Sequence, residues 1–327
     1  MTSSLLDVSD LRVAFATSDG VVQAVRGVSF SVGPGETLGI VGESGSGKSV
    51  CTQTLLGLTP GADISGTAMF DGADLLNLSP ERLRRIRGSE IAMIFQDPLT
   101  SLHPLYKVGW QIAELIRAHT EMSKKQALAR AAELLDMVGI PSPAERVKDY
   151  PHQFSGGMRQ RVMIAMALAL EPKLIIADEP TTALDATVQA QVLDLMLRLQ
   201  RDLGTALIII THDLGVVADI TDNVLVMYAG KAVEYTDRRS LYYQPHHPYT
   251  RGLLGSIPGS STGGGTAGER LRPIPGQPPS LISLPSGCPF HPRCPSVLPR
   301  CRDEEPNLLE VADAHRSACW LASEPEG

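Results

Sequence analysis

Residues 37–52 read TLGIVGESGSGKSVCT, and Gly42 to Ser49 form a complete G-x-x-x-x-G-K-S phosphate-binding loop. Glycines permit backbone turns that a Cβ would forbid, so that successive N–H groups can point at phosphate oxygens. Lys48 would place its charge near the β- and γ-phosphates, and the Ser49 hydroxyl is a Mg²⁺ ligand. An apolar strand precedes the loop, and a helix expected at 50–58 would turn its positive end toward the anion. These flanks disfavour the plain alternative, a Gly/Ser-rich turn that happens to contain a lysine.

The length and apolar content suffice for a large α/β domain, and the charge argues against nucleic acid as the main partner. The 327 residues are 43% hydrophobic, which is enough for one large α/β domain and something more. The net charge is −7, and no window holds a dense Lys/Arg cluster, so nucleic acid is not expected as a partner. No apolar run is long enough to span a bilayer, and the first residues lack the layout of a secretion signal. We therefore expect a cytosolic chain that touches a membrane only through a partner.

Alternating apolar residues near the start predict antiparallel strands. The alternation covers residues 11–15 and 28–32, with Asp19-Gly20 between them as a turn. The ring of Phe15 could stack on an adenine base, since aromatic faces pair in that way. A plain core position is the alternative for this residue. Cys51, alone in the helix after the loop, is expected to be a small buried residue.

Polar side chains end three apolar strands further along the chain. Gln96 follows a strand at 91–95, and its amide could reach a Mg²⁺ ion or an attacking water without trapping the metal. Residues 173–177 form an apolar run without alternation, as in a parallel strand covered on both faces, and Asp178-Glu179 follow it. Asp178 fits a Mg²⁺ partner, while Glu179 can orient and deprotonate the water. His212 ends a third strand and could contact a γ-phosphate, although a lone histidine is more often structural.

A second anion site is predicted at Ser155-Gly156-Gly157, at the start of a helix. One chain does not need two phosphate cradles for one nucleotide, so this one is expected to serve a nucleotide on another subunit. Residues 108–147 show a helical pattern and would form an insert between two halves of a sheet domain. A long amphipathic helix is expected after Asp185, closing near Gly204.

These motifs, in this order, resemble the ATP-binding subunits of ABC transporters over essentially the whole chain. Gly42–Ser49 looks like Walker A, Gln96 the Q-loop, and Phe154–Gln160 a signature in which Phe154 replaces leucine and Met158-Arg159 precede Gln160. Asp178 with Glu179 resembles Walker B and the catalytic glutamate, Ala183-Leu184-Asp185 the D-loop, and His212 the switch histidine. The ATP-contacting set implied by the resemblance is Phe15, Gly42, Ser44, Gly45, Ser46, Gly47, Lys48, Ser49, Val50, Gln96, Asp178, Ser155, Gly156, Gly157 and Asp185. Within it, Ser49, Gln96 and Asp178 would hold Mg²⁺, and Glu179, His212, Lys48 and Gln96 would be catalytic.

Other stretches are similar to the oligopeptide/dipeptide importer ATPases, a branch that also includes importers of nickel and other small solutes. They are MIFQDPLTSLHP, PHQFSGGMRQRVMIAMAL, HHPYTRGLL and IPGQPPSL with GCPFHPRC. His246-His247 could be mistaken for a metal site, whereas this branch favours packing. The resemblance implies a P-loop ABC core with an antiparallel β-subdomain and an inserted helical subdomain (about 99–165), all within residues 1–255.

The same resemblance implies the setting. We expect a peripheral ATPase on the cytoplasmic face of the plasma membrane that powers peptide import. It would work with a second ATPase subunit (a copy or a paralogue), two transmembrane permease subunits and an extracytoplasmic solute-binding protein. A DNA-repair or chromosome ATPase of the same superfamily is disfavoured, because no long coiled coil separates Ser49 from Phe154 and the chain is acidic. A two-cassette translation protein is disfavoured because we find a single cassette.

Four cysteines mark a small module after a predicted linker at 260–268. Cys288, Cys294, Cys301 and Cys319 lie in a proline-rich segment, within residues 256–327, that has too few apolar residues for a core of its own. Disulfides are improbable in the cytosol, which leaves a metal or cluster site, with unrelated thiols as the plain alternative. The spacing lacks the tight knuckles of zinc sites, and four thiolates can bind [4Fe–4S]. Resemblance to cluster-bearing peptide-importer ATPases favours iron–sulfur over zinc, and ATP binding at Lys48 is expected to be independent of this module.

Overall fold

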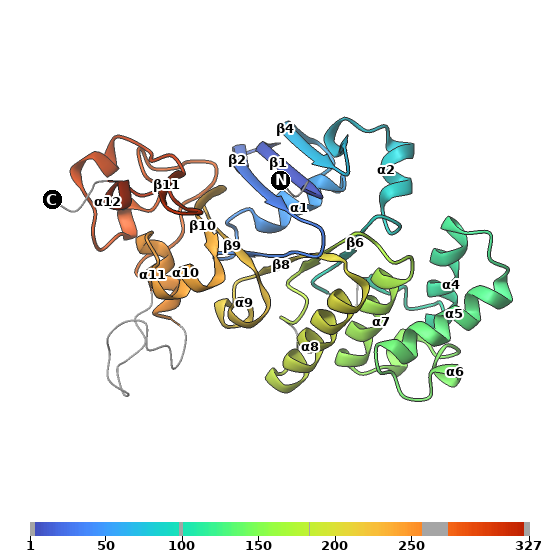
Figure 1. The fold of residues 1–327 in the computed structure, drawn as a ribbon. Coiled ribbons are helices and arrows are strands. Elements are labelled where there is room, and N and C mark those ends of the chain that lie inside the picture. Colours follow the sequence, from blue (N-terminus) through green and yellow to red (C-terminus); the bar gives the residue numbers. More distant parts are fainter. Residues whose placement is uncertain (1–3, 98–100, 183, 257–273, 324–327) are drawn as a thin grey trace. The chain divides into compact units, whose positions relative to one another are not determined.

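The computed structural model describes residues 4–97, 101–182, 184–256 and 274–323 (Figure 1). The chain forms two compact units. The first unit comprises 1–33, 37–77 and 210–327, and the second comprises 34–36 and 78–209. The predicted linker at 260–268, the start of the predicted helical subdomain at residue 99, and Ala183 of the D-loop lie outside the described residues. The predicted domain boundary after residue 255 stays a prediction.

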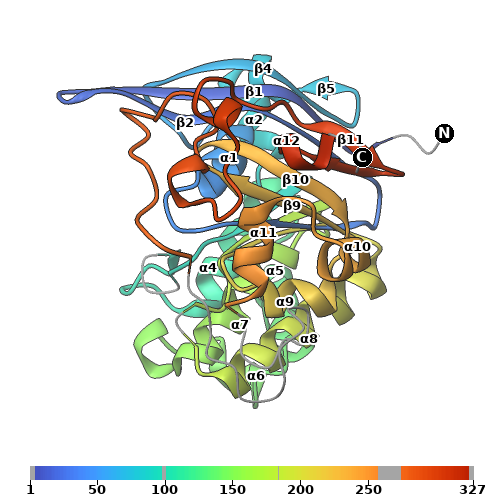
Figure 2. The same ribbon diagram turned by 90° about the vertical axis from the view of Figure 1, so that its left-hand side faces the viewer.

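An antiparallel sheet opens the first unit, as the alternating residues predicted (Figures 1 and 2). Its strand order is β2-β1-β4-β5, and Thr17 pairs with Gly20 across the expected turn. Apolar side chains that alternate with exposed ones, among them Leu11 and Val13, are buried on one face. The strands are β1 (Leu6–Thr17), β2 (Gly20–Val32), β4 (Ala62–Phe70) and β5 (Ala73–Asp74).

The strand that leads into the phosphate loop belongs to a second set of strands in the first unit. Their order is β11-β12-β10-β9-β3, with β3 parallel to β9 and the other pairs antiparallel. Every residue of β3 is buried, as expected for an apolar strand without alternation. The strands are β3 (Thr37–Val41), β9 (Asn223–Tyr228), β10 (Lys231–Asp237), β11 (Leu309–Ala312) and β12 (His315–Ser317).

Helices of the first unit are short. α1 begins at Lys48, two residues earlier than predicted, because Gly47 takes a left-handed conformation that lets the helix start directly at the loop. The helices are α1 (Lys48–Leu55), α9 (Leu214–Ile220), α10 (Arg238–Tyr243), α11 (Pro248–Leu254) and α12 (Trp320–Ser323), with 3₁₀ turns η1 (Leu75–Asn77), η3 (His291–Arg293) and η4 (Pro299–Arg302).

The cysteine-bearing segment shares the core of the first unit. Phe290 is 2% exposed and packs against Tyr228 of β9 and Tyr249 of α11, and Cys288 and Cys294 border the same cluster. That cluster also contains Val41, the last residue of β3. The predicted small module is therefore not confirmed, because the segment packs on the apolar surface of β9 and α11.

The second unit combines buried strands with a helical region. β6 runs parallel to β7, with Ile91 opposite Leu174, and all five residues of β7 are buried, as predicted. The unit boundary falls inside β8. The elements are α2 (Pro80–Ile86), β6 (Ile91–Ile94), α4 (Val108–His119), α5 (Lys124–Met137), α6 (Pro143–Arg146), η2 (Pro151–Gln153), α7 (Gly156–Leu168), β7 (Leu174–Asp178), α8 (Ala186–Leu203) and β8 (Ala206–Thr211).

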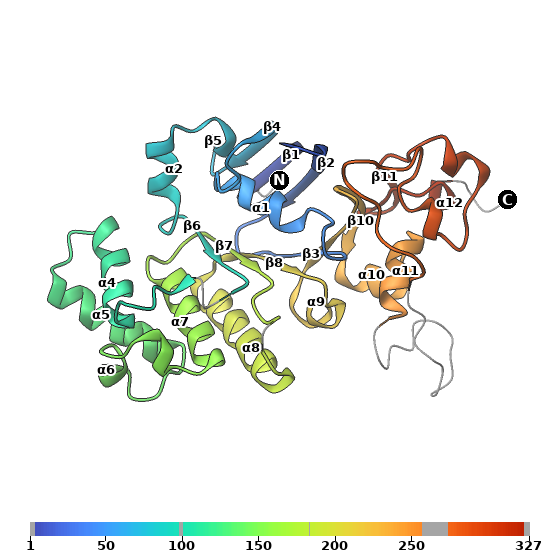
Figure 3. The ribbon, with the colours of Figure 1, turned by 180° about the vertical axis from the view of Figure 1, so that it is seen from behind.

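The region predicted as a helical insert at 108–147 is helical, and it consists of the three separate helices α4, α5 and α6. Figure 3 shows α4, α5 and α6 grouped together, and α7 beside α8. α7 starts at Gly156, as the predicted helix start at Ser155-Gly156-Gly157 implies, and Ser155 caps its N-terminus. α8 ends at Gly204 in a left-handed conformation, as expected. None of the helices in the described ranges has the length and apolarity to cross a membrane.

Candidate nucleotide-binding site

The phosphate loop joins β3 to α1 and requires glycine at two tight positions. Gly42 and Gly47 have φ angles of 152° and 97°. A Cβ on Gly42 would lie 2.2 Å from the carbonyl oxygen of Met227, and one on Gly47 would lie 2.2 Å from that of Ala24. The loop is thus pressed against β9 and β2 by its backbone, which fixes the direction of its N–H groups.

Lys48 lies at the centre of this loop. Its side chain is 4% exposed, and Nζ donates to the carbonyl oxygens of Gly42 (2.8 Å) and Glu43 (3.0 Å). The Ser46 hydroxyl is buried and finds no hydrogen-bond partner among the described residues. A buried hydroxyl without a partner costs free energy, so a phosphate oxygen placed here would satisfy it. The residues of the loop therefore fit the phosphates of a nucleotide.

The other predicted residues of the first unit lie on its surface or close to it. Phe15 is half-buried on β1, a position compatible with stacking on a base. Ser49 and Val50 are half-buried in the first turn of α1, and Ser44 and Gly45 are exposed in the loop. His212 is exposed directly after β8.

The second unit brings Gln96 and Glu179 together. Gln96 Nε2 donates to Glu179 Oε2 at 3.0 Å, and Thr182 Oγ1 donates to the same oxygen at 2.9 Å. Glu179 has a positive φ of 45°, a left-handed conformation that is unfavourable for a residue with a Cβ. Such strain at a half-buried carboxylate is typical of functional positions. The preceding Asp178 is 4% exposed at the end of β7.

The predicted signature forms the start of α7. Ser155 caps this helix, since its hydroxyl accepts a hydrogen bond from the Met158 N–H at 3.3 Å. Ser155 and Gly156 are exposed, and Gly157 is half-buried with the side chain of Val188 over it. A surface-exposed helix N-terminus with small residues is open to an anion from another molecule. Asp185 caps α8 through the N–H of Val188 at 3.0 Å.

Comparisons with known proteins identify the family. The ABC transporter model matches residues 25–182, and the model of the oligopeptide/dipeptide transporter C-terminal region matches 233–301. The dipeptide transport ATP-binding protein DppD of Bacillus subtilis is 52% identical over 97% of this chain and 94% of that protein. The oligopeptide transport ATP-binding protein OppD of Salmonella typhimurium is 54% identical over 97% and 93%. The chain belongs to the oligopeptide/dipeptide ABC transporter ATPases.

Solved structures agree with this family. A dimer of the ATP-binding cassette MJ0796 in a post-hydrolysis state with ADP and Pi has a TM-score of 0.65 at 26% identity, covering 72% of this chain and 99% of that one. cbiO1 of Clostridium perfringens, part of the transporter complex cbiONQ, has a TM-score of 0.62 at 29% identity, covering 74% and 91%. The predicted ABC ATPase fold and the predicted ATP hydrolysis that powers transport are confirmed for this oligopeptide/dipeptide transporter ATPase.

The four cysteines of this ABC ATPase border one pocket of the first unit. None of the four forms a disulfide, and burial raises the pKa of Cys288 to about 11 and raises the pKa values of Cys294 and Cys319 as well. Within the described ranges, no group of three or more Cys, His, Asp or Glu side chains is arranged to hold a metal ion. The predicted [4Fe–4S] cluster, and zinc as its alternative, are thus not confirmed. The four thiols line one pocket, but in the described part of the chain they are not placed as ligands of a common metal ion.

Sequence reasoning missed the residues that hold the predicted ones in place. Thr182 donates a hydrogen bond to the carboxylate of Glu179, while Arg293 and Tyr249 form hydrogen bonds with Glu43 of the phosphate loop. Tyr249 lies in the stretch HHPYTRGLL, and Arg293 lies in GCPFHPRC directly before Cys294. Both residues therefore belong to stretches on which the resemblance to peptide importers rests. No local pattern connects them with a loop more than 200 positions away in the sequence.

Proposed function

We propose that this ABC ATPase hydrolyses ATP to drive the import of dipeptides or oligopeptides through a membrane permease. The observation that carries the proposal is the match of the whole chain, including its C-terminal region, to peptide transport ATP-binding proteins. Nickel as the solute and a non-transport role are not favoured, because the relatives that match over the full length carry peptide transport in their names.

We assign the steps of hydrolysis to individual side chains. The N–H groups of the loop and Lys48 bind the β- and γ-phosphates, and Ser49 with Asp178 and Gln96 would hold Mg²⁺, which neutralises charge that develops on the phosphates. Glu179 orients the attacking water and accepts its proton. His212 contacts the γ-phosphate, and Phe15 stacks on the adenine.

The signature residues Ser155, Gly156 and Gly157 are proposed to complete the nucleotide site of a second ATPase subunit, together with Asp185. Exposure of the α7 N-terminus supports this role, because an anion from another molecule can approach it. The second subunit is a copy or a paralogue. Two permease subunits and an extracytoplasmic solute-binding protein complete the proposed system, with the ATPase bound peripherally at the cytoplasmic face of the plasma membrane and with no nucleic acid partner.

Purification from membranes tests this assembly. The tagged chain, extracted in mild detergent, should carry with it two polytopic membrane proteins and an ATPase subunit, identified by mass spectrometry. The matched control is Lys48→Ala, which should retain the same partners and lose ATP turnover. Recovery of the chain with DNA and without any membrane protein would contradict the proposal.

We propose further that Cys288, Cys294, Cys301 and Cys319 bind a [4Fe–4S] cluster, with zinc as the alternative. The four cysteine side chains line a common pocket and form no disulfide, which supports this, and a bound metal would have to draw the sulfur atoms inward and displace their protons. Protein purified without oxygen should be brown and contain iron and acid-labile sulfide, and Cys301→Ser should bleach it. Stoichiometric zinc without sulfide would reject the cluster, and metal-free, colourless protein would reject both.

A further inference from the structure

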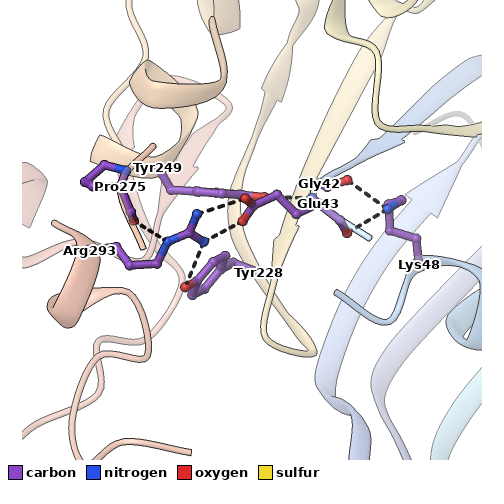
Figure 4. Close-up of polar contacts among 7 residues, drawn as sticks. All are labelled: Gly42, Glu43, Lys48, Tyr228, Tyr249, Pro275 and Arg293. Atoms are coloured by element: carbon purple, nitrogen blue, oxygen red, sulfur yellow. Dashed lines mark hydrogen bonds and ion pairs between the residues drawn. The ribbon is translucent and has the colours of Figure 1, made fainter. Parts of the chain in front are cut away.

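The carboxylate of a phosphate-loop residue is held by an arginine from the cysteine-bearing segment (Figure 4). The guanidinium of Arg293 donates to both oxygens of Glu43, at 2.6 Å to Oε2 and 2.9 Å to Oε1. The side chain of Arg293 is 4% exposed and that of Glu43 is 27% exposed. Arg293 Nε also donates to the carbonyl oxygen of Pro275 at 2.9 Å, which fixes the plane of the guanidinium. A two-point contact of this kind sets direction as well as distance.

The main chain of Glu43 is held as well. Its N–H donates to the hydroxyl of Tyr249 at 2.8 Å. Tyr249 is fully buried on α11, where its ring packs against those of Tyr228 and Phe290. Tyr228 in turn lies within hydrogen-bonding distance of Arg293, at 3.4 Å. Two independent contacts from the C-terminal third of the chain therefore converge on one residue of the loop.

That residue also contacts the phosphate-binding lysine. The carbonyl oxygen of Glu43 accepts from Lys48 Nζ, as does that of Gly42. Glu43 thus has its N–H, its carbonyl and its carboxylate engaged at once, in a chain of contacts from Arg293 to Lys48. A shift of the Glu43 peptide would move an oxygen that now holds the lysine ammonium.

We propose that Arg293 and Tyr249 are positioning residues of the phosphate loop, through which the cysteine-bearing segment sets the ATP affinity of its own chain. The inference rests on the proposed function in one respect: the loop is taken to bind ATP. Arg293 ends the turn η3 (His291–Arg293), between Cys288 and Cys294, so the fold of that segment determines where the guanidinium lies. A change in the segment would thereby reach the loop through the ion pair between Arg293 and Glu43.

Plain stabilisation is a weaker explanation of this pair. Burying an arginine and a carboxylate costs desolvation, and apolar residues of similar volume often stabilise a core as well or better. By contrast, an ion pair that fixes the orientation of the loop would help its backbone N–H groups to point at the phosphates. The two explanations differ in what they predict for nucleotide affinity in folded protein.

Equilibrium titration of the full chain with MgATP provides the test. Glu43→Gln and Arg293→Gln should each raise the Kd for ATP by about tenfold, because each leaves the other partner without its bidentate bond. The Kd of the double variant should not exceed the higher of the two single-variant Kd values, because the same interaction between Glu43 and Arg293 is lost in all three variants. Arg300→Gln is the matched control, because Arg300 pairs with Glu304 at 3.2 Å in the same segment, and its Kd should equal that of the wild type.

Two milder variants keep the test decisive if a glutamine variant fails to fold. Tyr249→Phe removes only the hydroxyl bound to the Glu43 N–H and should raise the Kd by about threefold, while Arg293→Lys should recover part of the affinity lost in Arg293→Gln. Thermal unfolding of each variant identifies the folded fraction. Wild-type Kd values in folded Glu43→Gln and Tyr249→Phe protein would overturn the inference. Failure of the wild-type chain to bind ATP would instead overturn the proposed function.

Discussion

Gln96 Nε2 lies 3.0 Å from Glu179 Oε2, so the amide of the predicted Q-loop is hydrogen-bonded to the carboxylate of the predicted base. Both residues follow neighbouring parallel strands, β6 and β7, at their carboxyl ends. That edge is where ligands bind in open α/β sheets. In this conformation Oε2 accepts from both Gln96 and Thr182, which fixes the direction of the carboxylate.

Glu179→Gln tests the general base. The amide keeps the size of the side chain and cannot accept a proton, so ATP hydrolysis should fall by about 10²–10⁴-fold while ATP binding persists. Steady-state turnover and equilibrium MgATP binding are measured on the same preparation. Turnover close to that of the wild type would remove the assignment.

Thr182→Val tests whether the orientation of Glu179 matters. The change removes the Thr182 donor to Oε2 at nearly constant volume, and we expect kcat to fall by about tenfold with little change in the KM for ATP. Thr182→Ser restores the hydroxyl and should restore most of the rate. A rise in KM at constant kcat would assign Thr182 to nucleotide binding instead.

Complementation between chains tests the role of the signature. Mixing Lys48→Ala chains with Gly156→Asp chains should restore one composite site in a homodimer, because each variant damages a different half of the site. Gly156 is better suited than Gly157, since a Cβ at Gly156 would meet only Leu184 Cδ2 at 3.9 Å, whereas at Gly157 it would lie 2.6 Å from Val188 Cγ1. The change at Gly157 would therefore disturb its own subunit.

For an obligate heterodimer, one change is placed in each paralogue. About half of the wild-type ATPase activity should be present when the two changes are in different chains. None should be present when both changes are in one chain and the other chain is unchanged, provided that both chains fold normally. The reverse pattern, with about half of the sites active when both changes are in one chain and none when they are in different chains, would place the signature in the site of its own subunit.

The buried His247 gives the first unit a pH-dependent stability. Its side chain is 2% exposed, Nδ1 accepts from the N–H of Tyr249, and burial lowers its pKa to about 4. The unfolded chain, with a histidine pKa of about 6.5, then binds more protons than the folded one between about pH 4 and 6.5. The free energy of unfolding that depends on neutral His247 is therefore fully present above pH 6.5, and it falls by up to about 3 kcal/mol as the pH is lowered toward 4.

His247→Asn isolates this contribution. Asparagine does not titrate here and can still cap α11, so the free energy of unfolding should depend less on pH between 4 and 6.5 than in the wild type. Urea titrations at several pH values measure the difference. Parallel pH profiles of the two proteins would show that His247 has an ordinary pKa in the folded state.

Much of the nucleotide machinery was predictable because it is local. The strand, loop and helix around Lys48 follow from spacing alone, and the buried run before Asp178 identifies a parallel strand. Phe15 and His212 were placed correctly on their elements, although their roles stay predictions. Even the burial of Cys51, whose pKa burial raises to about 12, follows from its place on the inner side of α1.

Long-range contacts were not predictable in this way. Glu43 and Arg293 are 250 positions apart, and nothing in either neighbourhood marks the other as a partner. For that reason the cysteine-bearing segment was expected to be an independent module that leaves ATP binding unaffected. The structure shows instead a direct ion pair from that segment to the phosphate loop, because the segment completes the apolar cluster of β9 and α11.

Uptake of a labelled peptide into proteoliposomes tests the central claim most directly. The purified ATPase with its co-purified permease is reconstituted, solute-binding protein and a labelled tripeptide are supplied outside, and MgATP is enclosed with the ATPase. We predict peptide accumulation that requires ATP, disappears with Glu179→Gln, and is matched by ATP turnover that rises when peptide is present. ATP turnover without peptide accumulation, together with uptake of a different solute such as nickel by the same vesicles, would contradict the account.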